Sequence, residues 1–224
     1  MRKVLRALAL FVAIVAVLLA LPLFFLPEGE RAPPPTHGLP WQIEKLADGA
    51  TRVFGLVPGR STLEEAQKLF GPEVKVALVI APGETGSLEA YYESISAGGL
   101  AGRMVLTLAS TLELREAMLQ RARKAEYMKS TTRQVELADV DLAHAQTATI
   151  EAIAFIPAAN LDEQIVLQRF GPPAERIRSA EHREHFLYPD RGLELQLDAK
   201  GKEVLQYVAP QSFARLRDPL PTKQ

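Results

Sequence analysis

The longest feature of the hydrophobic pattern is an uncharged apolar run over residues 7–26. At about 1.5 Å of rise per residue, a helix of this length covers about 30 Å, the thickness of the hydrocarbon core of a bilayer. Arg2, Lys3 and Arg6 precede the run, and two glutamates follow it closely. The positive-inside rule therefore predicts a single-pass inner-membrane helix, with the N-terminus in the cytoplasm and the C-terminal domain in the periplasm.

A cleaved signal peptide is the alternative interpretation of this run. The run is longer than the core of about 7–15 apolar residues found in most signal peptides, and no small-x-small cleavage site closes it. For cleavage after Ala20, for example, the upstream small position is occupied by Leu18. We therefore expect the helix to be retained as a signal-anchor, and a mature chain that starts between residues 21 and 33 contradicts this expectation.

Residues 27–40 are rich in proline and have no apolar periodicity. Such a segment favours polyproline II and acts as a semi-rigid spacer of about 3.1 Å per residue. We expect it to hold the folded part away from the membrane. Trp41 opens the folded region, where we expect it at a core or edge position.

Beyond Trp41, segments with the period of strands alternate with segments with the period of helices, which predicts an α+β fold. Ser61 and Glu64 have the spacing of a capping box at the start of a helix. Gly71-Pro72 ends this helix after Phe70. We take residues 41–137 as a first lobe. Its predicted elements are strands over 51–57, 74–81, 88–95 and 103–109, a helix over 61–70, a turn over 97–102 and a long helix over 111–128.

The pattern then recurs over residues 138–217. Phe-Gly-Pro occurs at 70–72 and again at 170–172, each time after a short helical segment and before strands. This repetition predicts an internal duplication, that is, two lobes with a helix followed by an antiparallel sheet, although chance similarity of two short stretches is the alternative. From Pro210 we expect an ordered strap that frays in the tail, residues 218–224. The predicted elements of the second lobe are strands over 150–156, 175–179, 183–188, 192–197 and 203–208 and a helix capped by Asn160 and ending at Phe170.

The second lobe resembles the SmpA/OmlA family, which has the BamE-like fold. The resemblance is carried by Arg169-Phe-Gly-Pro-Pro and by Phe186-Leu-Tyr-Pro at the end of a strand. Tandem β-lactamase-inhibitor domains are similar to it. The whole chain also resembles uncharacterised membrane-anchored proteins of Gram-negative bacteria. The resemblance implies the fold and a binding role. Members of the assembly family are anchored through a lipid-modified cysteine, whereas this chain has no cysteine.

Composition limits the classes of function. The sequence contains 26 basic and 27 acidic residues. Without Arg2, Lys3 and Arg6, 23 basic residues remain against 27 acidic ones, a net charge of −4. A mildly acidic domain argues against nucleic-acid binding, which needs a basic surface. The absence of cysteine excludes disulfides and thiolate metal sites.

Two short clusters invite a ligand interpretation, and we favour an ordinary structural one for both. His182 and His185 point to opposite faces if their segment is a strand, so they are poorly placed to share a metal ion, and we expect a solvated charged edge. The segment 59–62 at a helix start can bind an anion through free backbone amides. A normally capped helix explains the same residues, and no complete phosphate-binding loop is present.

The residues most typical of a protein interface are Tyr91, Tyr92, Arg121 and Lys124. The two tyrosines are neighbours in a strand and must point to opposite faces, so one of them is expected at the surface, where tyrosine favours interfaces. Arg121 and Lys124 belong to a basic stretch on the predicted long helix. It is suited to lipid headgroups or an acidic partner, although we favour a solvated helix face as its explanation.

No pattern predicts a cofactor or an enzyme. No serine lies in a Gly-x-Ser-x-Gly elbow. We therefore expect a non-enzymatic protein-binding or scaffold module that acts on another envelope protein. The alternative is an envelope enzyme or small-ligand sensor with a site between the lobes, lined by His144, Arg60 or Glu64.

Overall fold

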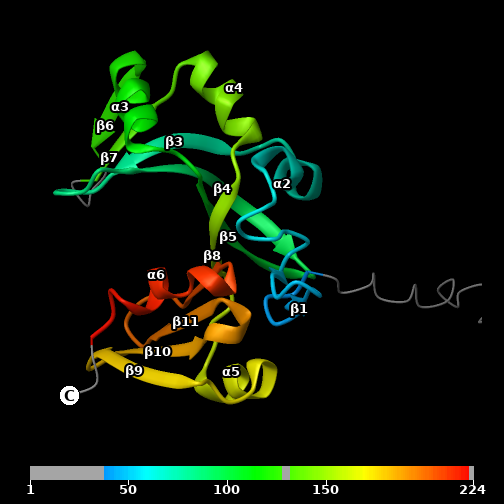
Figure 1. Ribbon diagram of the computed structural model, residues 1–224. Helices are drawn as coiled ribbons and strands as arrows, with labels where there is room; N and C mark the ends of the chain where they lie inside the picture. The colour runs from blue at the N-terminus through cyan, green and yellow to red at the C-terminus, as the bar shows by residue number, and fades with distance from the viewer. Residues whose placement is uncertain (1–37, 128–131, 222–224) are drawn as a thin grey trace, which may run out of the picture. The chain divides into compact units, whose positions relative to one another are not determined.

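The computed structural model describes residues 38–127 and 132–221. The described chain is α+β, with one large antiparallel sheet and few helices (Figure 1). None of the helices in this part is both long and apolar enough to cross a membrane. The predicted anchor, residues 7–26, lies outside the described residues, as do most of the spacer and the end of the tail.

Ten strands form the large sheet, in the order β6-β7-β3-β4-β5-β8-β12-β11-β10-β9. We call β6-β7-β3-β4-β5 the first half of the sheet and β8-β12-β11-β10-β9 the second half. Each strand is antiparallel to its neighbours, and the pairing of β5 with β8 joins the halves. The bounds are β3 Lys75–Ile80, β4 Ser87–Ala97, β5 Leu100–Leu108, β6 Lys124–Tyr127, β7 Arg133–Glu136, β8 Ile150–Pro157, β9 Glu175–Ala180, β10 Arg183–Tyr188, β11 Leu193–Asp198 and β12 Val204–Val208.

Each of the four longer helices buries apolar residues in the core. Leu63 of α2, Met118 of α3, Ala145 of α4 and Phe170 of α5 all belong to one hydrophobic core that includes strands of both halves. Trp41 packs against the same core, as expected. The helices are α2 Leu63–Phe70, α3 Leu112–Arg121, α4 Asp139–Thr147, α5 Glu163–Phe170 and α6 Ala214–Arg217, and short 3-10 turns cover Pro189–Arg191 (η1) and Pro210–Ser212 (η2).

A second, smaller core lies where the C-terminal segment packs on the second half of the sheet. Phe213 joins Ile177, Leu187 and Val208 there, each from a different element. Arg217 of α6 donates two hydrogen bonds to Glu175 of β9, at 2.8 and 3.0 Å. The predicted ordered strap is therefore confirmed for residues 210–221.

The sequence prediction of a strand over 51–57 is wrong. Pairing is limited to two residues, Thr51–Arg52 (β2), which face Glu44–Lys45 (β1). Val53 and Leu56 then close a tight turn, in which Phe54 has a φ of 55°. The apolar residues of this segment are buried in the core instead of alternating along a strand, which explains why their composition resembled that of a strand.

The predicted helix over 111–128 is too long. It begins after Thr111, whose side chain accepts a hydrogen bond from the Leu114 amide, and it ends at Arg121. Ala122 is extended, and β6 then pairs with β7. The sequence shows no local sign of this pairing, because the partner strand is contributed by residues that carry no clear alternation. The structure adds β7 and α4, which were not predicted.

The two predicted helix caps are displaced by one and two residues. Thr62 and Glu65 form the capping box of α2, one residue after the predicted pair. Asp162, rather than Asn160, caps α5 by accepting a hydrogen bond from the Ile165 amide at 2.7 Å. Strands β3, β4, β5 and β8 to β12 are confirmed, and the turn predicted over 97–102 is reduced to Gly98 and Gly99, because β4 and β5 extend to meet it.

Candidate functional site

A surface groove lies where α2 ends beside the middle of β4. It is lined by residues 70–75, which lead from α2 into β3, and by residues 91–94 of β4, and its volume is about 650 Å³. The turn at its rim follows from the sequence, since Gly71 ends the helix with a φ of 94° and Pro72 cannot continue it. Two of the predicted interface residues, Tyr91 and Tyr92, therefore belong to one groove.

The strand edge at this groove is free of its β3 neighbour. Pairing of β3 with β4 ends at Lys75 and Tyr91, whereas β4 runs on to Ala97. Over this extension the described pairing is with β5 alone, and it is interrupted by a register shift between Tyr92 and Ile95. An edge of this kind leaves main-chain donors and acceptors available to another extended segment.

Tyr92 contributes a buried hydroxyl without a partner. Its side chain is 1% exposed, and its ring centroid lies 5.8 Å from that of Phe70. Within the described residues the hydroxyl makes no hydrogen bond. Burial raises the pKa of Tyr92 to about 12, so the group stays protonated at neutral pH and can donate. Tyr91 points to the other face and remains partly exposed.

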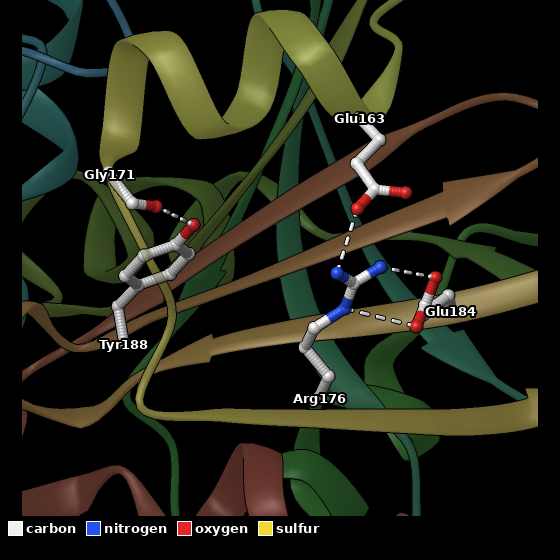
Figure 2. A network of polar contacts seen from close by, with 5 residues as sticks. All are labelled: Glu163, Gly171, Arg176, Glu184 and Tyr188. Atoms are coloured by element: carbon white, nitrogen blue, oxygen red, sulfur yellow. Dashed lines mark hydrogen bonds and ion pairs between the residues drawn. The ribbon is translucent and has the colours of Figure 1, made fainter.

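The second half of the sheet offers a direct comparison. Phe170 and Tyr188 are also in ring contact there, with centroids 6.1 Å apart, although their planes are tilted by 38° where those of Phe70 and Tyr92 are nearer perpendicular at 69°. Here, however, the Tyr188 hydroxyl donates to the carbonyl oxygen of Gly171 at 2.9 Å, as Figure 2 shows. Trp41 meets Phe170 edge-on at 6.2 Å, and the guanidinium of Arg169 lies over the indole. Phe170 and Tyr188 thus have partners from the chain itself.

An ion-pair network beside Tyr188 fixes α5 to the sheet. Arg176 of β9 donates to both carboxylate oxygens of Glu184 on β10 and to Glu163 in the first turn of α5 (Figure 2). These hydrogen bonds raise the pKa of the Arg176 guanidinium above its usual range. The same guanidinium lies 4.5 Å from the centre of the Phe186 ring. With each of its three side-chain nitrogens donating to a neighbouring carboxylate, this arginine has a structural role.

The basic residues predicted for the interface do not gather at the groove. Arg121 donates to Asp141 of α4, whose side chain is almost fully buried, and thereby joins α3 to α4. Lys124 lies on β6 rather than on a helix, and it pairs with Glu126 on the same strand. The structure therefore brings Tyr91 and Tyr92 together and leaves Arg121 and Lys124 in separate roles.

His182 and His185 have separate surroundings. His182 lies 3.7 Å from Asp198. His185 is 4% exposed, so the expectation of a solvated edge is wrong for this residue. It is buried because it faces the strap side of the sheet together with Leu187 of the small core. In the described ranges, no group of three metal-ligating side chains is found.

His185 instead belongs to a hydrogen-bonded series that the sequence did not reveal. The Ser179 hydroxyl lies 2.6 Å from Nε2 of His185, and Nδ1 of His185 lies 2.6 Å from a carboxylate oxygen of Glu194. Gln206 donates to the other oxygen of Glu194 at 2.8 Å. The residues come from four adjacent strands, so only the strand register brings them together.

The segment 59–62 is an ordinary helix start. The Ser61 hydroxyl accepts a hydrogen bond from the Val57 amide, and Thr62 caps α2. Arg60 pairs with Asp48 at 2.6 Å. Of the residues expected to line a site between the lobes, Glu64 pairs with Lys68 on its own helix, and His144 lies near the end of α4.

Comparisons of the chain with protein-family models, with curated proteins and with solved structures find no match. The resemblance to the SmpA/OmlA family accordingly stays a prediction from short motifs.

Proposed function

We propose that this chain is a single-pass inner-membrane protein whose periplasmic domain binds another envelope protein and catalyses no reaction. The groove beside Tyr92 carries the proposal. It combines partly exposed aromatic residues, a free strand edge and a buried hydroxyl without a partner. Aromatic residues are enriched at protein interfaces, and free edges are used to pair with partner chains. In this proposal residues 7–26 anchor the domain and residues 27–40 hold it clear of the bilayer.

We further propose that the sheet consists of two copies of one lobe. Helices α2 and α5 begin and end 100 residues apart, at 63–70 and 163–170, and β3 and β9 have the same spacing. The strand order supports the duplication, because β3-β4-β5 runs toward the middle of the sheet just as β9-β10-β11 does from the other end. Both helices also end at a glycine with positive φ.

Site-specific crosslinking in cells tests the binding function. A photo-reactive amino acid at Ser94, in the groove, is compared with the same amino acid at Lys200, on the exposed turn between β11 and β12. We expect one envelope protein to be crosslinked from position 94 and not from position 200. Equal recovery at both positions, or none at either, contradicts the proposal.

An acyl-transfer enzyme is the second candidate, and one observation favours it. Ser179, His185 and Glu194 follow one another in the order nucleophile, base and orienting carboxylate, at hydrogen-bond distances. A fluorophosphonate, which reacts with activated serines, tests this function on the full chain. Labelling of Ser179 in the parent protein that is lost in Ser179→Ala and in His185→Ala supports an enzyme. If the parent protein is labelled no more strongly than Ser179→Ala, this function is excluded.

A further inference from the structure

We infer that the groove binds an extended segment of the partner, with an aromatic side chain placed on Phe70 and the main chain paired along the free edge of β4. This inference rests on the proposed binding function and names the chemistry of the partner. Three independent features of the described residues lead to it: the strand edge, the uncovered aromatic ring and the hydroxyl of Tyr92.

The strand edge calls for an extended ligand. The pairing of β3 with β4 ends at Lys75 and Tyr91, but β4 continues to Ala97. An added strand can therefore pair with this part of β4, on the side where β3 pairs with the rest of the strand. Glu93 and Ser94 are exposed at this place, and Ile95 turns into the core. Addition of a strand to such an edge gives affinity through main-chain hydrogen bonds, and pockets for alternate side chains give specificity.

The aromatic requirement follows from the comparison of the two halves. In the second half, Trp41 comes from an N-terminal segment of the same chain and covers Phe170, which is 2% exposed. The Tyr207 hydroxyl donates to the Pro40 carbonyl at 2.9 Å and holds this segment in place. In the first half, Phe70 stays partly exposed, and its ring contact among the described residues is with Tyr92.

Phe70 therefore has the surroundings of Phe170 without the covering ring. A partner segment that presents Trp, Phe or Tyr supplies that ring, in the way that Trp41 does in the second half. An edge-to-face pair of this type contributes beyond the apolar area that it buries. The groove is large enough for such a side chain and its flanking main chain.

The hydroxyl of Tyr92 selects for a hydrogen-bond acceptor. Its counterpart, Tyr188, already donates to Gly171, whereas the Tyr92 hydroxyl has no acceptor within the described residues. A carbonyl oxygen of an extended main chain is the acceptor that every strand offers. Because Lys75 and Glu93 lie 3.5 Å apart and pair with each other at the groove, no single charge dominates the choice of ligand.

The experiment begins from the crosslink at Ser94 in the full chain. Mass spectrometry identifies the crosslinked segment of the partner, and a short synthetic peptide of that segment is titrated against the detergent-solubilised protein. We expect a peptide that contains an aromatic residue and binds. Replacement of that residue by alanine should weaken binding by about tenfold or more, since aromatic anchors dominate interfaces, and Tyr92→Phe should weaken it about fivefold, as expected for one hydrogen bond.

Two controls separate this mode of binding from others. Peptides with N-methyl groups at alternate residues lose main-chain donors, and one of the two methylation patterns should abolish binding. Tyr188→Phe makes the same chemical change in the second half and should leave the affinity unchanged. If both methylated peptides bind as well as the parent, or the crosslinks map to a helix, this inference is overturned while the binding function stands. If no partner is crosslinked from position 94, both fail.

Discussion

Tyr92 and Tyr188 lie beside corresponding phenylalanines, and they differ in what their hydroxyls contact. Tyr188 donates to Gly171, whereas the buried hydroxyl of Tyr92 has no partner in the described chain. Burial of an unpaired hydroxyl costs free energy, while a buried hydrogen bond contributes about 1 kcal/mol. The same substitution is therefore expected to have opposite effects at the two positions.

We predict that Tyr92→Phe raises the free energy of unfolding by about 1 kcal/mol and that Tyr188→Phe lowers it by about 1 kcal/mol. The measurement is urea unfolding of the full chain in detergent, followed by the fluorescence of Trp41, the one tryptophan of the sequence. Equal destabilisation by both substitutions shows that the Tyr92 hydroxyl has a partner after all, and removes one of the three supports for the proposed ligand.

At the scale of elements, the C-terminal strap should contribute strongly to stability. Phe213 is buried against β9, β10 and β12. We predict that Phe213→Ala lowers the free energy of unfolding by about 3 kcal/mol, the usual cost of removing a buried phenylalanine ring. Arg215→Ala is the matched control on the same segment, since its ion pair with Glu151 is exposed and should contribute less than about 1 kcal/mol. A similar loss in both variants contradicts the role assigned to the ring.

The turn between β11 and β12 makes stability depend on pH. The Lys200 amide, and then Arg183, lower the pKa of Asp198 below its usual value of 3.8. The Asp198 carboxyl of the unfolded chain thus binds a proton at a higher pH than that of the native chain. Ionised Asp198 therefore stabilises the native chain at pH values above the usual pKa, and this stabilisation is lost as the pH falls toward the lower native pKa. We predict that Asp198→Asn flattens the decline of the urea midpoint between about pH 5 and pH 3. A parallel decline in the variant and the parent contradicts this role.

The sequence predicts elements well where local periodicity and turn residues agree. The strands β8 to β12 and the two helices before Phe-Gly-Pro are examples, because Gly71 and Gly171 mark helix ends without reference to the rest of the chain. The sequence does not predict elements whose conformation depends on contacts with distant residues. Residues 124–127 form a strand only because β7 pairs with them. The unpartnered hydroxyl of Tyr92 and the series through His185 likewise depend on strand register, which no local pattern specifies.

At the scale of the whole molecule, the continuous sheet has a consequence for folding. Strand β8 pairs with β5 on one side and β12 on the other, and one core includes residues of both halves. We predict that the described region unfolds in one cooperative transition. Far-ultraviolet circular dichroism, which reports all strands, should give the same urea midpoint as the fluorescence of Trp41, which reports its contact with Phe170. Two separate midpoints show that the halves unfold independently.

The predicted membrane topology can be tested by labelling introduced cysteines, because the chain contains no cysteine of its own that would also react. We place single cysteines by Lys3→Cys, before the apolar run, and by Glu30→Cys, after it, in the full chain in a Gram-negative host. If residues 7–26 span the inner membrane with the N-terminus inside, a membrane-impermeant maleimide applied after permeabilisation of the outer membrane labels position 30 and spares position 3 until the cells are lysed. Labelling at position 3 in intact spheroplasts reverses the orientation. A mature chain from which position 3 is missing shows that the run is a cleaved signal peptide, and then the proposed groove operates in a domain that is not held to the membrane by this helix.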